Sequence, residues 1–102
     1  MKFHNKYYIF FSKLSNKLRV DIVSSLNSKE KTVSELVKEL NLEQSKISHA
    51  LMELRDCNIV YFEPRGKERV YFLNETIKPI LKLIDLHSKK CCNCKECNLC
   101  GK

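Results

Sequence analysis

Tryptophan is absent from this chain of 102 residues, and glycine and proline occur only twice each. The scarcity of glycine and proline argues against a loop-rich or disordered chain. Long hydrophobic runs are also missing: the apolar run at residues 7–11 is too short for a membrane span or for the hydrophobic region of a signal peptide. We therefore expect no membrane partner. Small secreted proteins spread their cysteines along the chain, whereas here they gather at one end, so we expect a reducing, cytoplasmic location.

Acidic residues are fewer than basic ones. Nineteen Lys and Arg residues stand against twelve Asp and Glu residues, for a formal charge of +7. This excess favours an anionic partner, nucleic acid before a membrane surface. The length suits one small domain. Because no paired carboxylates and no nucleophile–base pattern stand out, we do not expect an enzyme.

Apolar residues recur at intervals of three or four over several stretches, which predicts amphipathic helices. The helices are expected at residues 5–26 (with a break near 15–16), 32–41, 43–56 and 76–90. Thr32 and Glu35 form a capping box, and Asn41 suits the tight turn that ends that helix. Pro79 fits only in the first turn of the last helix, whose apolar residues cover more than one stripe and so indicate a second partner surface.

Between the third stretch and the last helix the pattern changes to strands. Residues 59–63 and 69–73 are β-branched and aromatic, and residues 64–67, Pro-Arg-Gly-Lys, are turn material. Residues 29–31 are expected to be a polar connector. The order helix, helix, helix-turn-helix, basic hairpin predicts a winged helix, a mainly α fold with a small β-hairpin, over residues 1–90.

One face of the helix at 43–56 and the hairpin carry the candidate DNA contacts. The helix offers donors and acceptors that can face base edges, and the hairpin offers cations that can neutralise phosphates. The candidates are Gln44, Ser45, Lys46, Ser48, His49, Arg65, Lys67 and Arg69. Each patch alone is more often a solvated polar surface or a solubilising basic hairpin. Their order along the chain favours binding to double-stranded DNA.

Several of these segments together resemble the ArsR/SmtB family of transcriptional regulators. The likeness is carried by residues 11–19, 32–36, 42–51, 54–60 and 65–73, and it spans roughly residues 5–85. The resemblance implies a homodimer joined through the first and last helices, with each recognition helix in a major groove. It also implies repression of transcription that is relieved when an inducer binds, commonly a metal or metalloid.

Two metal sites common in this family lack their ligands here. Thr32 and Ser34 stand where some members have Cys-x-Cys, and hydroxyls are poor ligands for soft metals. Ile77 stands where an Asp-x-His motif would place its histidine. The Asp85-x-His87 pair comes about three turns too late, so a surface histidine is the better interpretation, and His4 is interpreted in the same way.

Five of the six cysteines lie between residues 91 and 100, in a tail at 91–102 with little apolar company. The candidate metal ligands are Cys91, Cys92, Cys94, Cys97 and Cys100. Such thiolates could hold zinc tetrahedrally, another soft metal or a metalloid, or an iron–sulfur cluster. They could equally switch by disulfide formation without metal. Cys57, the sixth, is expected to be a small buried apolar residue.

These observations predict a dimeric, sequence-specific DNA-binding regulator, a repressor, that is released or modulated by a metal, metalloid or redox signal at the tail. One alternative is a metal-storage or iron–sulfur protein that uses the winged helix for protein contacts. Another is a DNA-binding regulator whose tail has a purely structural metal or no regulatory role.

Overall fold

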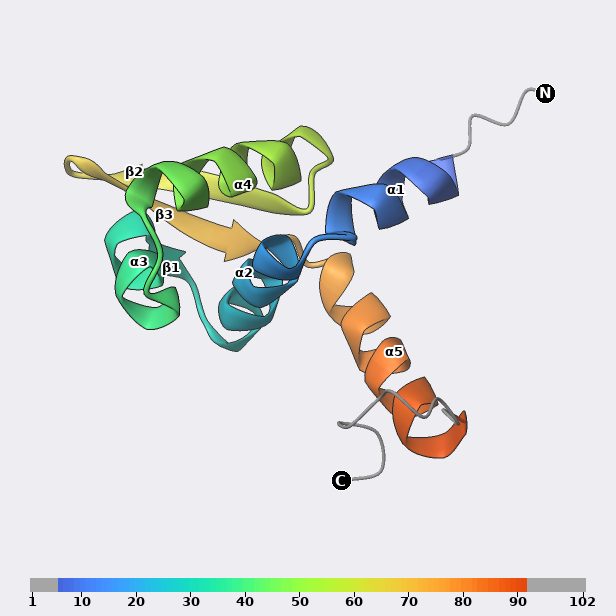
Figure 1. Cartoon of the computed structure of the whole chain (residues 1–102). Helices are drawn as coiled ribbons and strands as arrows, with labels where there is room; N and C mark the ends of the chain where they lie inside the picture. Colours follow the sequence, from blue (N-terminus) through green and yellow to red (C-terminus); the bar gives the residue numbers. More distant parts are fainter. Residues whose placement is uncertain (1–5, 92–102) are drawn as a thin grey trace.

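Five helices and three short strands make up residues 6–91, the part of the chain that the computed structural model describes (Figure 1). They follow in the order α1 (Lys6–Leu14), α2 (Lys17–Ser28), β1 (Lys31–Thr32), α3 (Val33–Leu40), α4 (Gln44–Asp56), β2 (Val60–Arg65), β3 (Glu68–Leu73) and α5 (Ile77–Cys91). The predicted winged helix, mainly α with a small hairpin, is confirmed.

Local signals in the sequence set the ends of the helices. The side chain of Asn16 accepts a hydrogen bond from a backbone amide in the first turn of α2. Thr32 and Glu35 form the capping box that opens α3. Asn41, with φ 56°, closes α3, and Asn58, with φ 58°, follows α4, because asparagine adopts the left-handed conformation at little cost. Each helix therefore begins and ends close to its predicted bounds.

The sheet has three antiparallel strands in the order β1-β3-β2. The prediction of a polar connector at residues 29–31 was wrong at Lys31, which pairs with Tyr71 in β3. The predicted turn at residues 64–67 was too long: pairing continues to Arg65 and Glu68, which leaves only Gly66 and Lys67 in the turn. Gly66 has φ +65°, which suits the first position of a type II′ turn.

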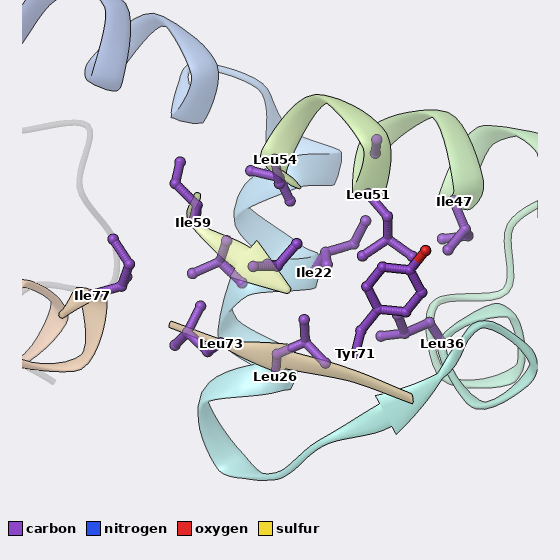
Figure 2. Close-up of a cluster of buried hydrophobic side chains, with 13 residues drawn as sticks. Ile22, Leu26, Leu36, Ile47, Leu51, Leu54, Ile59, Tyr71, Leu73 and Ile77 are labelled. Atoms are coloured by element: carbon purple, nitrogen blue, oxygen red, sulfur yellow. The ribbon is translucent and has the colours of Figure 1, made fainter. Parts of the chain in front are cut away.

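The core lies between α4, α2, α3 and one face of the sheet (Figure 2). Leu51 and Leu54 of α4, Ile22 of α2 and Leu36 of α3 are completely buried, and each contributes about 1.5–3 kcal/mol on burial. This packing positions α3 and α4 against the sheet.

Helices α1 and α5 project from the same end of the molecule, away from the tip of the hairpin (Figure 1). Only the early part of α5 contributes to the core, through Ile77 and the half-buried Ile80 and Leu81. Further along, Leu83, Ile84 and Leu86 are exposed. The excess apolar surface predicted for this helix is therefore present. No helix within residues 6–91 is long and apolar enough to cross a membrane.

Candidate nucleic-acid interface

The predicted DNA-contacting residues of α4 all lie on the surface of the molecule. Gln44, Ser45, Lys46 and His49 are exposed and Ser48 is half-buried. The opposite stripe of the helix is buried in the core and consists of Ile47, Ala50, Leu51 and Leu54. The core therefore fixes the rotation of α4 about its axis, and with it the side chains that α4 presents to a partner.

A groove of roughly 390 Å³ lies between the start of α3, the outer side of α4 and the hairpin. Gln44, Ser48 and Arg55 line it from α4, and Lys67 and Arg69 line it from the hairpin. Glu68 is the acidic residue among those that line the groove. The groove thus joins two of the predicted helix contacts to two of the predicted hairpin contacts in one positively charged surface.

Arg65 is not part of that groove. Successive residues of a strand point to opposite faces, and the register pairs Arg65 with Glu68 and Pro64 with Arg69. Arg69 therefore faces α4 while Arg65 lies on the other face. There it lines a second depression together with Glu30, Glu35 and Glu68. The three hairpin cations, predicted as one group, are divided between two faces.

His49 lies on the side of α4 that faces α1. Its Nε2 is 3.9 Å from Glu53 Oε2, and Lys13 Nζ of α1 lies 2.5 Å from the other carboxylate oxygen. The hydrogen bond from Lys13 lowers the pKa of Glu53, and the same bond raises the pKa of Lys13. A charged link therefore connects the N-terminal helix to the helix that carries the candidate base contacts.

Arg55 also lines the groove between α4 and the hairpin, although the sequence did not predict it as a DNA contact. Its guanidinium carbon lies 4.8 Å from the ring centroid of Phe62, and that of Arg69 lies 4.5 Å from the same centroid. The spacing from Ser48 to Arg55, two helical turns, was a signal that could have placed both residues on one face. Within residues 6–91, no ion pair involves Lys46, Arg55, Arg65, Lys67 or Arg69.

The positions considered above as possible metal sites outside the tail lie in different parts of the structure. In residues 6–91 no group of three or more His, Cys, Asp or Glu residues is arranged to hold a metal ion. Thr32 and Ser34 line the groove, Ile77 is in the core, and Asp85 and His87 are exposed on α5.

Among the cysteines, Cys57 is half-buried against the core, as expected for a structural residue. Cys91 is the last residue of α5. Cys92, Cys94, Cys97 and Cys100 lie outside the described residues, as does His4.

Comparison with known proteins agrees with this geometry. The family described as "Bacterial regulatory protein, arsR family" matches residues 16–61. The transcriptional regulator HlyU from Vibrio vulnificus CMCP6 is 30% identical, with a TM-score of 0.70 and coverage of 78% of this chain and 83% of HlyU. The transcriptional repressor BigR from Xylella fastidiosa is 27% identical, with a TM-score of 0.72 and coverage of 86% of this chain and 89% of BigR.

A more distant structure shares the fold. It is the homodimeric winged helix-turn-helix DNA-binding domain of Mb0332 from Mycobacterium bovis, at 15% identity and a TM-score of 0.70, with coverage of 79% of each chain. No match is found among curated proteins. Since the family and these relatives are regulators, the expectation that the chain is not an enzyme is confirmed. The chain belongs to the ArsR family of bacterial regulatory proteins.

Proposed function

We propose that this protein binds double-stranded DNA as a homodimer and represses transcription. The observation that carries the proposal is the surface of α4 and the hairpin, where polar side chains lie beside cations that form no ion pair within residues 6–91. Gln44 and Ser48 can hydrogen-bond to base edges, while Lys67 and Arg69 can approach the phosphates that flank them. BigR, described as a transcriptional repressor, supports the direction of regulation.

Dimerisation is proposed through the exposed apolar faces of α1 and α5. Tyr7 and Phe11 of α1 are 70% and 58% exposed, and Leu83 and Leu86 of α5 are 64% and 49% exposed. Monomeric proteins seldom leave so many large apolar side chains uncovered at one end of the molecule. A two-fold axis through these helices would cover both copies and would place two α4 helices on one DNA duplex. Mb0332, described as homodimeric, supports this arrangement.

The test is a selection of duplexes from a random library, followed by titration of the best sequence at several salt concentrations. Lys46→Gln should weaken binding and reduce the slope of log affinity against log salt by about 1.8. That value is about 0.9 for each lost phosphate contact, counted twice in a dimer. The matched control is Lys82→Gln on α5, far from the groove. A wild-type protein that selects no sequence and binds no duplex would refute the proposal.

We propose further that the signal acts at the cysteine tail. Helix α5 continues to Cys91, so the tail follows directly from the helix proposed to join the subunits. A ligand held by Cys91, Cys92, Cys94, Cys97 and Cys100 could therefore change the angle between the two α5 helices. Zinc, another soft metal or metalloid, an iron–sulfur cluster and a disulfide remain the candidate chemistries.

A variant with these five cysteines replaced by serine tests the role of the tail. It should bind DNA as the wild type does, but its affinity should no longer respond to thiophilic metals or oxidants. Metal analysis and the absorption spectrum of protein purified without oxygen identify the bound species. If the variant still leaves DNA when the metal is added, the tail is not the sensor. If neither protein responds, the tail has no regulatory role, and the metal analysis shows whether it holds a structural metal.

A further inference from the structure

Two arginines that line the groove between α4 and the hairpin share one aromatic ring, a feature that the predicted DNA contacts do not account for. Arg55 of α4 and Arg69 of β3 lie over the ring of Phe62 of β2. We propose that Arg55 and Arg69 form a clamp for a single backbone phosphate of DNA, with Phe62 as the positioning residue. This inference rests on the proposed DNA-binding function and gives Arg55 a role in it.

The geometry of the hairpin brings the three side chains together. Phe62 pairs with Tyr71 and Pro64 pairs with Arg69, so Phe62 and Arg69 are diagonal neighbours on the face of the sheet that looks toward α4. The ring of Phe62 also packs on Tyr71, with 5.4 Å between their centroids, and Tyr71 is only 7% exposed. The ring is therefore a fixed platform that rests on the core.

Both guanidinium groups lie within the range of a cation–π interaction, about 6 Å from a ring centroid. Arginine loses considerable rotamer freedom when it binds a ligand, and stacking on an aromatic ring removes part of that cost in advance. The planar guanidinium can then offer two parallel N–H donors to phosphate oxygens. Arg55 and Arg69 are thus held in place before a phosphate arrives.

The charge of the two arginines favours an anionic ligand. Two cations that converge on one ring repel each other, and neither forms an ion pair within residues 6–91. Glu68 lines the same groove, but it makes no ion pair with either of them. An anion in contact with both guanidiniums would offset the repulsion. Because Gln44 and Ser48 line the same groove, a DNA strand whose bases meet α4 would bring its backbone there.

The proposal predicts a loss of affinity that does not depend on sequence. Phosphate contacts fix the position of a protein on DNA but carry no direct sequence information. Arg55→Gln should weaken binding to the selected duplex and to a scrambled duplex by the same factor, about tenfold. Arg55→Lys should restore only part of the affinity, because an ammonium group lacks the planar fork.

Salt dependence shows whether the two arginines share one phosphate. In the double variant Arg55→Gln/Arg69→Gln, the slope should fall by about 1.8 for the dimer, the value for one phosphate in each half-site. A fall near 3.6 would indicate two separate phosphates and would overturn the shared clamp. Lys82→Gln serves again as the control for a lost charge on the surface.

Phe62 is tested as a positioning residue. Phe62→Leu keeps both cations but removes the aromatic ring on which they stack. The affinity for DNA should therefore fall, while thermal unfolding followed by circular dichroism should stay cooperative. Phe62→Tyr should restore affinity, since it keeps the ring. If Arg55→Gln binds both duplexes with the affinity and slope of Lys82→Gln, the clamp is wrong although the wild type binds DNA. If the wild type binds no duplex, the proposed function itself fails.

Discussion

Replacing Leu83 by alanine tests whether α5 joins two subunits. Leu83 is 64% exposed in the single chain. A fully buried leucine contributes about 1.5–3 kcal/mol, so covering the exposed part in a dimer would contribute about 1–2 kcal/mol. A two-fold interface contains the residue twice. Leu83→Ala should therefore weaken the dimer by about 2–4 kcal/mol, which is roughly a 30- to 1,000-fold increase in its dissociation constant.

Sedimentation velocity over a range of protein concentrations measures this constant. The matched control is Asp85→Ala, because Asp85 is exposed on nearly the opposite side of α5 from Leu83, and it should leave the constant almost unchanged. Circular dichroism of both variants checks that the helices are intact. The reasoning is refuted if Leu83→Ala dimerises as tightly as the wild type, or if the wild type is a monomer at every concentration.

Three other predictions concern the stability of the fold. Leu51→Ala, in the middle of the buried stripe of α4, should lower the free energy of unfolding by about 2–5 kcal/mol in urea titrations. Thr32→Ala removes the cap of α3 and should cost about 1 kcal/mol in the same assay. The pKa of Glu35 is lowered by the hydrogen bond from the backbone amide of Thr32, and the pKa of Glu39 by that from the Ser25 hydroxyl. The stability that these two carboxylates contribute to the fold is therefore present above the unfolded pKa of about 4.3 and is lost as the pH falls through the lower folded values. The melting temperature of the wild type should fall over this range, and Glu39→Gln should reduce that fall.

The helices could be predicted from the sequence because their signals are local. Asn16, the Thr32–Glu35 capping box and Asn41 each act within one turn of their own helix, and the apolar spacing identified the face of α4 that is buried. The order of these elements was then enough to predict a winged helix.

The missed features depend on contacts between distant parts of the chain. Strand β1 exists only because Lys31 and Thr32 pair with β3, and two residues carry no pattern of their own. The separation of Arg65 from Arg69 follows from the hairpin register, which a longer assumed turn concealed. The approach of Arg55 to Phe62 depends on how α4 crosses the sheet, and spacing along a single helix cannot reveal that.

The two-residue turn at Gly66 and Lys67 limits how this hairpin can vary during evolution. Because side chains alternate between the faces of a strand, inserting or deleting one residue in β3 before Arg69 would move that side chain to the face now occupied by Arg65. Substitutions of the other hairpin residues would leave the division of charge intact, whereas a single-codon insertion or deletion there would put both arginines on one face. Homologues that retain this surface should therefore vary in composition at the hairpin but keep its length.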